Sequence, residues 1–187
     1  MTITITAPDT LAGTYRLDPA HTRIGFVARH AMVTKVRGSF NEFDGSGYFD
    51  PENPSNSKLA LGIKAASVDT RNPDRDGHLR GVDFFDVENH PDITFVSTSV
   101  EQLDDSHFRV TGDLTVKGVT RPVAADLELT GAAVDPFGNQ RIGLEGTATV
   151  SRKEFGLTWN VALEAGGVLV SDKVTLEFEV SAIRSSD

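Results

Sequence analysis

The sequence predicts an all-β fold, in which about eight antiparallel strands close into a single barrel with only short helical turns. Two observations lead to this prediction. Apolar and polar residues alternate with a period of two over most of the chain, as in strands that bury one face. No stretch shows the apolar period of a helix of ordinary length, and 17 glycines and 8 prolines supply turns.

The alternation places the expected strands along the chain. They cover residues 15–18, 22–30, 36–49, 58–67, 93–100, 107–116, 123–129, 142–150 and 174–180. Asp18-Pro19-Ala20-His21 is a turn, because proline disfavours helix at the residue before it. In the strand that follows, the row that we expect to face inward is Ile24, Phe26, Ala28 and His30.

Two segments depart from a simple strand. Within 36–49 the aromatic residues change phase between Phe40 and Phe43, which a bulge near Asn41-Glu42 would explain. Gly45 and Gly47 then suggest a sharp bend. Residues 151–172 begin with a helix-like turn, continue with alternating apolar residues, and include Gly166-Gly167, which looks mobile.

A sandwich and a closed barrel both bury one face of every strand. We favour closure because the inward rows carry many small residues, which leave room for a small ligand. These residues are Ala28, Gly45, Gly47, Ala65, Gly112, Ala125, Gly146 and Ala148. Small residues also permit tight packing between sheets, so the pattern alone leaves both architectures open.

Composition excludes several classes of protein. A formal charge of −9 and a pI near 5.0 argue against nucleic-acid binding, and no run of about 18 apolar residues is available for an integral membrane helix. There are no cysteines, hence no disulfide framework. The first residues lack the pattern of a secretory signal, so we expect a cytoplasmic protein. Residues 1–13 are expected to form a tail, followed by one domain at 14–184.

The stretch 75–86 interrupts the alternation most clearly. It combines Arg75, His78 and Arg80 with the paired rings of Phe84 and Phe85, which some part of the fold must bury. We read it as a loop at the barrel mouth, where contact with a ligand is most expected.

Several segments together resemble the YceI-like, polyisoprenoid-binding family, from about residue 14 to 183. They are Asp18-Pro19-Ala20-His21-Thr22 with Phe26 and His30, Arg75-Asp76 with His78-Leu79, Asp83-Phe84-Phe85-Asp86, Pro91 with Ile93 and Phe95, the run 112–122, Arg152 with Phe155-Gly156-Leu157, and Asp172-Lys173-Val174. The resemblance implies a lipocalin-like barrel whose apolar interior takes a long isoprenoid chain. Many members of the family are periplasmic, and the absence of a signal pattern here departs from them.

The candidate ligand-binding residues follow from both arguments. They are Phe26, His30, Phe40, Phe43, Arg75, His78, Arg80, Phe84, Phe85, Phe95, Leu157 and Trp159. Each ring can line a cavity or fill a core, and for any single ring the core is the commoner role. Arg75, His78 and Arg80 can hold a polar head group, or the two arginines can simply neutralise Asp76 and Asp83.

Enzymatic and metal-dependent functions have weaker support in the sequence. His30, His78 and His90 could be combined with Asp76 or Asp86, but their spacing matches no compact metal motif, so we expect no metal and no cofactor. The chain also lacks cysteine and a Gly-x-Ser-x-Gly nucleophile turn, and we assign no catalytic residue.

The expected function is therefore binding, storage or transport of a long-chain isoprenoid or a related lipid. A hydrolase or isomerase that acts on a lipid-like substrate, and a ligand-free structural or stress protein, are the alternatives. The expected partner is the lipid ligand, without nucleic acid, and the oligomeric state is left open, a homodimer included.

Overall fold

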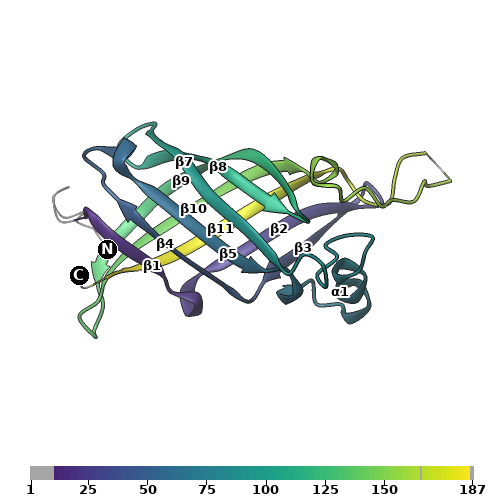
Figure 1. The fold of residues 1–187 in the computed structure, drawn as a ribbon, viewed down its shortest axis with the longest axis horizontal. Coiled ribbons are helices and arrows are strands. Elements are labelled where there is room, and N and C mark those ends of the chain that lie inside the picture. The colour runs from purple at the N-terminus through teal and green to yellow at the C-terminus, as the bar shows by residue number, and fades with distance from the viewer. Residues whose placement is uncertain (1–10, 165, 186–187) are drawn as a thin grey trace.

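The chain forms an elongated antiparallel β-barrel, shown by a computed structural model that describes residues 11–164 and 166–185 (Figure 1). Its strands are β1 (Gly13–Leu17), β2 (Arg23–His30), β3 (Thr34–Phe40), β4 (Phe43–Phe49), β5 (Lys58–Lys64), β6 (Val68–Asp69), β7 (Asp92–Gln102), β8 (His107–Val116), β9 (Val119–Val134), β10 (Gln140–Ser151) and β11 (Lys173–Arg184). One α-helix, α1 (Pro73–Arg80), lies among the described residues, and short 3₁₀ turns occupy Pro19–His21, Pro54–Asn56, Ala65–Ser67 and Arg152–Phe155.

Eight strands close the ring, in the order β1, β4, β5, β7, β8, β9, β10 and β11, with β11 pairing back to β1. The predicted closed barrel is thus confirmed. β2 continues the path of β1 along β11, because Leu17 lies opposite Ala182 and Ile24 lies opposite Phe178. The turn predicted at Asp18 separates the two strands, and the Asp18 carboxylate accepts a hydrogen bond from the Ala20 amide at 3.1 Å.

The expected single strand over 36–49 is wrong. The chain breaks at Asn41-Glu42 into β3, which pairs with β2 and β6, and β4, which pairs with β1 and β5. A break in the ladder, rather than a bulge within one strand, therefore produces the phase change between Phe40 and Phe43. The strand expected over 58–67 likewise ends early, at Lys64, and a 3₁₀ turn leads into β6.

The two glycines of β4 allow its backbone to lie unusually close to its neighbours. A Cβ atom at Gly47 would lie 2.6 Å from the Lys58 carbonyl oxygen, and one at Gly45 would lie 2.9 Å from a methyl group of Leu17. Glycine is therefore required at position 47, where β4 crowds the backbone of β5, whereas at position 45 the end of the Leu17 side chain would have to move.

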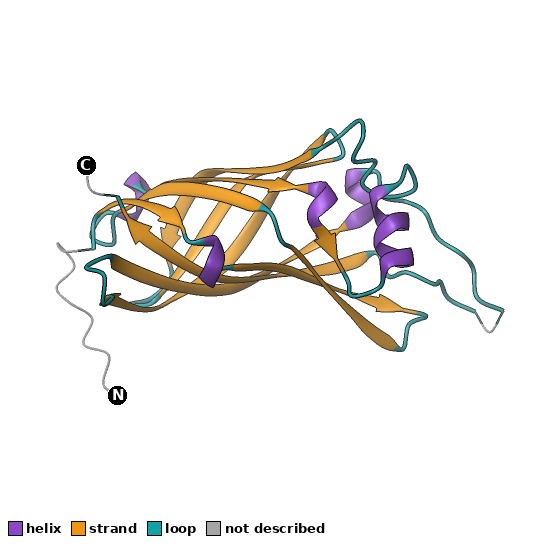
Figure 2. Ribbon diagram, turned by 90° about the horizontal axis from the view of Figure 1, so that it is seen from below, coloured by secondary structure: helices purple, strands orange, loops and turns teal. Residues whose placement is uncertain are grey.

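Helix α1 occupies part of the stretch that we expected to be a loop. Its N-terminus has the usual signals: the Asn72 side chain accepts a hydrogen bond from the Arg75 amide at 3.1 Å, and Pro73 takes the first helical position. Gly81 follows its last residue. Figure 2 shows α1 at one end of the barrel, whereas both described ends of the chain lie at the other.

The core is divided into two clusters along the barrel. One, at the end with the chain termini, includes Leu11, Tyr15 and Phe108, and the other, beneath α1, includes Phe40, Phe84 and Phe155. Four half-buried residues pack against both clusters: Phe95, Val123, Leu176 and Phe178. Leu11 is only 2% exposed although we assigned it to the tail, and residues 1–10 of that tail lie outside the described residues.

Within the described part of the chain, no helix is long and apolar enough to cross a bilayer.

Candidate functional site

A cavity of about 340 Å³ lies inside the barrel and is lined by residues of both core clusters. This volume is at the lower end of the range of small-molecule sites in proteins. Nearly all of the lining is aliphatic, aromatic or glycine. The lining residues with polar atoms in their side chains are Tyr15, Ser46, Tyr48, Ser57, Lys58 and Arg152.

Half of the predicted ligand-binding residues line this cavity. They are Phe26, Phe40, Phe84, Phe85, Phe95 and Leu157. The rings of Phe26 and Phe40 have centroids 5.7 Å apart, and Phe85 meets Phe40 edge-on at the same distance. Three rings from β2, β3 and the segment after α1 thus form a continuous aromatic wall. Contact of these residues with a ligand stays a prediction.

A second aromatic group covers the end of the barrel beside α1. Phe84 is 5% exposed, and its ring lies 5.5 Å from that of Trp159 and 5.0 Å from that of His78. His78 also meets Trp159 edge-on at 4.6 Å. Trp159 therefore packs behind Phe84 and is not part of the cavity lining.

The two arginines of the predicted head-group site bind the protein itself. Arg75 donates to the hydroxyl and carbonyl oxygens of Thr70, both at 2.8 Å. Arg80 donates to the carbonyl oxygens of Ala66 and Val68, at 2.9 and 3.2 Å. The alternative in which they simply neutralise Asp76 and Asp83 is corrected, because their guanidinium groups attach α1 to backbone and side-chain oxygens of residues 66–70.

The carboxylates of this segment have other partners. Asp76, 7% exposed, accepts hydrogen bonds from the amide and the hydroxyl of Thr70. Asp83 pairs with His78 at 2.9 Å on the surface. The buried Asp76 thus completes the attachment of α1, while the His78 pair remains open to solvent.

Two further candidates lie outside the cavity lining. His30 is exposed at the end of β2, where it forms an isolated bridge with Val170, so its inward orientation is corrected. The inward row ends at Ala28 because β2 runs on past the barrel. Phe43 packs against the second cluster without reaching the cavity.

Arg152 is a cavity residue that we did not assign to the site. Its side chain, buried to 5% exposure, donates to the carbonyl oxygens of Ser171, Trp159 and Val170 at 2.8, 3.0 and 3.1 Å, and also to that of Leu157. Burial lowers the pKa of this guanidinium, and the carboxylate of Asp172 opposes that shift. Arg152 thus fixes the segment that carries Leu157 and Trp159; its only signal in the sequence was its place in a family motif.

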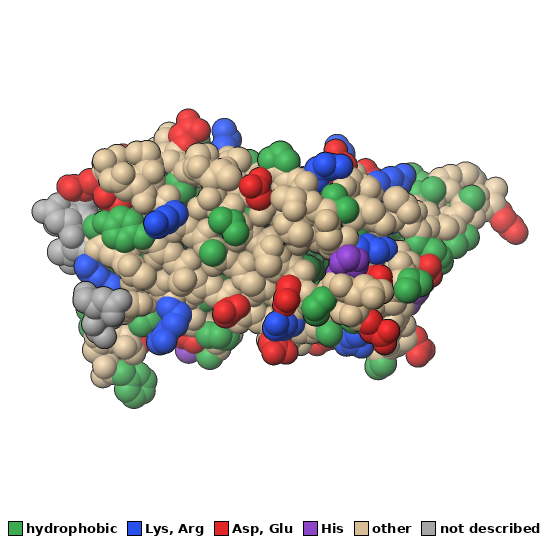
Figure 3. Space-filling view, in the orientation of Figure 1, with side chains coloured by type: hydrophobic (Ala, Val, Ile, Leu, Met, Phe, Trp, Pro, Cys, Tyr) green, Lys and Arg blue, Asp and Glu red, His purple; other side chains and the backbone are tan. Residues whose placement is uncertain are grey.

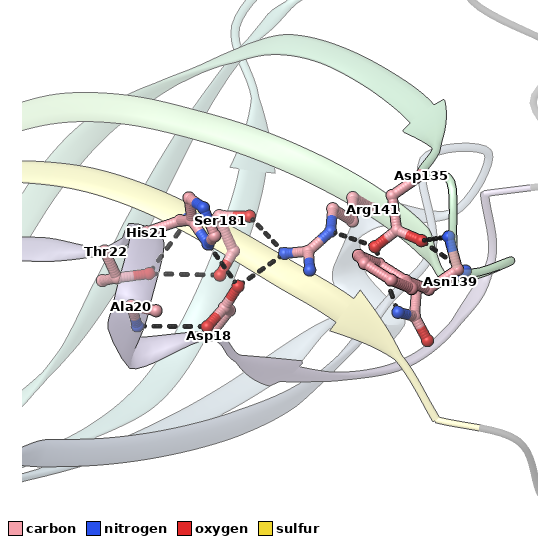
Figure 4. A network of polar contacts seen from close by, with 9 residues as sticks. Asp18, Ala20, His21, Thr22, Asp135, Asn139, Arg141 and Ser181 are labelled. Carbon is pink, nitrogen blue, oxygen red and sulfur yellow. Dashed lines mark hydrogen bonds and ion pairs between the residues drawn. The ribbon is translucent and has the colours of Figure 1, made fainter.

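A polar network lies on the barrel wall near the described chain ends, and none of its residues is among those that line the cavity (Figure 4). Arg141 donates to Asp18 at 2.6 Å and to Asp135 at 2.7 Å. Hydrogen bonds from Arg141 and His21 lower the pKa of Asp18 to about 2, and Arg141 holds the pKa of Asp135 well below its usual range. The network links the turn after β1, strand β10 and the turn before β10.

Within the described residues, no group of three or more histidine, aspartate or glutamate side chains is arranged to hold a metal ion.

Comparison with known proteins gives a consistent result. The family model described as the YceI-like domain matches residues 15–182. A UPF0312 protein of Pectobacterium atrosepticum is 42% identical over 81% of this chain and 80% of its own length. A UPF0312 protein of Pseudomonas aeruginosa is 40% identical over 96% of this chain and 91% of its own length.

Solved structures resemble the barrel. A YCEI protein of Campylobacter jejuni superimposes with a TM-score of 0.73 at 32% identity, over 84% of this chain and 90% of that one. BcnA of Burkholderia cenocepacia has a TM-score of 0.77 at 23% identity, over 88% of this chain and 98% of its own. A polyisoprenoid binding domain from Saccharophagus degradans has a TM-score of 0.67 at 17% identity, over 91% of this chain and 98% of its own. At such identities the last two indicate the fold alone.

Proposed function

Because this chain belongs to the YceI-like family, we propose that it binds a long-chain isoprenoid or a related amphiphilic lipid in its barrel, as a binding protein rather than an enzyme. The observation that carries the proposal is the apolar cavity of about 340 Å³, whose lining extends from one core cluster to the other. One solved domain of this fold is described as a polyisoprenoid binding domain, and we propose the same ligand class for this chain.

The physical basis is the burial of apolar surface. Each Å² of lipid chain removed from water contributes roughly 25 cal/mol, so a long chain can bind with few polar contacts. Methyl-branched isoprenoids present rounded surfaces that fit between ring faces, and Phe26, Phe40 and Phe85 supply such faces. We propose that these rings, with Phe95 and Leu157, contact the bound chain.

Binding without turnover fits the chemistry of the lining. Its described residues include no histidine, aspartate or glutamate, the side chains most often used as general acids and bases. Arg152 already donates to four backbone carbonyl oxygens. The polar groups that line the cavity are thus better suited to orienting one end of an amphiphile than to breaking its bonds.

A pair of substitutions on β9 tests the proposal. Ala125 is 8% exposed and lines the cavity, whereas its neighbour Ala124 is exposed on the outer face. Ala125→Phe should fill part of the cavity and reduce the amount of retained lipid. Ala124→Phe adds the same ring outside the barrel and should retain as much lipid as the parent.

Native mass spectrometry of freshly purified protein, repeated after incubation with a polyprenol, gives the bound mass and its stoichiometry. A parent that binds no polyprenol would refute the proposal, and so would equal retention by the two variants when thermal unfolding shows both to be folded.

A further inference from the structure

Exposed apolar side chains gather at the end of the barrel that carries α1. Met32 and Val33 lie in the turn between β2 and β3 and are 63% and 76% exposed. Val161 and Val168 lie in the loop before β11, which protrudes from the same end (Figure 1), and are 46% and 37% exposed. We call these four side chains the apolar tip. Figure 3 shows hydrophobic side chains along this protruding loop.

The two segments of the apolar tip lie side by side. The Ala31 amide donates to the Leu169 carbonyl oxygen at 2.7 Å, and the Ser171 amide donates to that of Arg29 at 3.1 Å. A side chain at Gly167 would collide with the sulfur of Met32. The tip is therefore one continuous surface made by two parts of the chain.

The turn in the apolar tip carries an exposed methionine at a position where a different residue would make the turn more stable. Ala31 and Met32 have φ angles of 50° and 62°, and the Val33 amide closes the turn onto the His30 carbonyl oxygen at 3.1 Å. Such positive angles favour asparagine or glycine at both positions. The turn thus carries a large apolar side chain in a strained and exposed position, which is an outlier from which we infer a role for that side chain.

Cations flank the apolar tip on the outer face of the barrel. Arg29 lies opposite Lys35 on the β2–β3 hairpin, Arg37 lies two pairs further along, and Lys173 begins β11. These four side chains border a shallow groove of about 310 Å³, in which Glu177 is the acidic residue. We call them the basic collar. Among the described residues, no hydrogen bond or ion pair uses the ammonium groups of Lys35 or Lys173.

The opposite end of the barrel has exposed apolar residues in an acidic setting. Phe137 is 89% exposed and Leu103 is 42% exposed, but Asp135 lies beside the first, and Asp104 and Asp105 follow the second. On a chain of net charge −9, the basic collar thus places four cations beside the apolar tip, whereas Asp135, which pairs with Arg141, lies next to Phe137, and two acids follow Leu103.

From these observations we propose that the protein docks on anionic lipid bilayers, with the apolar tip inserted among the head groups and the basic collar against their phosphates. Exposed apolar side chains beside clustered cations are the combination that binds such interfaces. The inference does not require a filled cavity. If the proposed function also holds, docking brings the end of the barrel covered by α1 to the membrane that would supply the lipid.

Two variants separate the apolar and electrostatic contributions. The double variant Ala31→Asn, Met32→Gly removes the methionine and relieves the strained turn, so it should bind vesicles more weakly while unfolding at a higher urea concentration. Misfolding cannot produce that pair of changes. The double variant Lys35→Gln, Lys173→Gln should lower the partition coefficient by about twenty-five-fold, at about five-fold for each surface cation.

Matched controls act at the other end of the barrel. Phe137→Ser removes an exposed apolar side chain, and Arg16→Gln with Arg109→Gln removes two exposed cations. Both should bind vesicles like the parent. Glu164 is an exposed acid on the protruding loop, and Glu164→Lys should strengthen binding.

The measurement is co-sedimentation with vesicles of phosphatidylcholine alone, and with vesicles of phosphatidylcholine and phosphatidylglycerol in equal parts. We expect binding to the anionic vesicles only, weakening as salt is added. Failure of the parent to bind the anionic vesicles, equal binding to both compositions, or an equal loss in variants and controls would each overturn the proposal. These outcomes leave polyprenol binding by the cavity untouched, so the two proposals can fail separately.

Discussion

Replacement of Arg152 by methionine is the most informative perturbation of the cavity wall. The guanidinium donates to carbonyl oxygens from two chain segments, at Leu157 and Trp159 on one side and at Val170 and Ser171 on the other. Methionine fills a similar length of space but donates no hydrogen bond. The backbone of both segments then loses its shared charged donor.

The expected cost follows from these contacts. Asn160 also donates to the Val170 oxygen, at 2.8 Å, which leaves three carbonyl groups that depend on Arg152. The bond to the Leu157 oxygen is buried, and an acceptor left unsatisfied in such a site costs about 1–3 kcal/mol. The bonds to Ser171 and Trp159 are only partly buried, so water replaces part of what these two oxygens lose. Releasing the guanidinium from its buried site offsets part of this cost, since burying a charge is itself unfavourable. We expect Arg152→Met to lower the free energy of unfolding by about 2–3 kcal/mol.

Urea unfolding followed by tryptophan fluorescence measures this change, and Trp159, the sole tryptophan of the chain, reports on the affected segment. Arg152→Lys should fall between parent and Arg152→Met, because one ammonium group reaches fewer of the carbonyls. Arg121→Met, on the exposed face of β9, is the control. An Arg152→Met protein within about 0.5 kcal/mol of the parent would refute this account of the cavity wall.

Two further predictions concern charged groups. Because the pKa of Asp18 falls from 3.8 to about 2 on folding, its stabilisation is complete above pH 4 and is lost as the pH falls toward 2. The urea midpoint of the parent should therefore drop over this interval by more than that of Asp18→Asn, and parallel curves would contradict the prediction. Arg80→Ala should lower the thermal midpoint and weaken binding of charged and uncharged prenyl chains alike, because Arg80 attaches α1 to the barrel. A selective loss of the charged ligand would instead assign Arg80 to the head group.

The barrel could be predicted from the sequence because the alternation of apolar and polar residues that marks each strand is a property of neighbouring residues. Alternation identified β2, β5 and β8, since each buries one face against a continuous interior. The same rule failed for His30, because periodicity gives the phase of a strand and not the point at which it leaves the barrel. It also failed at Asn41-Glu42, where a phase change is compatible with either a bulge or a break.

Helix α1 was missed for a different reason. Leu79 is its only large apolar residue, so it carries no apolar period, although Asn72, Pro73 and Gly81 mark its two ends. The contacts that hold it are formed with residues 66–70 and depend on the tertiary fold. The bond between Asp18 and Arg141 spans 123 residues and likewise leaves no local signal.

The division of the core has a consequence for how the protein opens. We expect the two clusters, which share contacts with Phe95, Val123, Leu176 and Phe178, to open as separate units. Without ligand, amide hydrogens of β2 and β3 should exchange with solvent earlier than those of β9 and β10, which lie in long ladders. A lipid chain that spans the cavity would contact both units at once. The bound lipid would then join the two clusters into one core, and the amide exchange rates of β2 and β3 would approach those of β9 and β10.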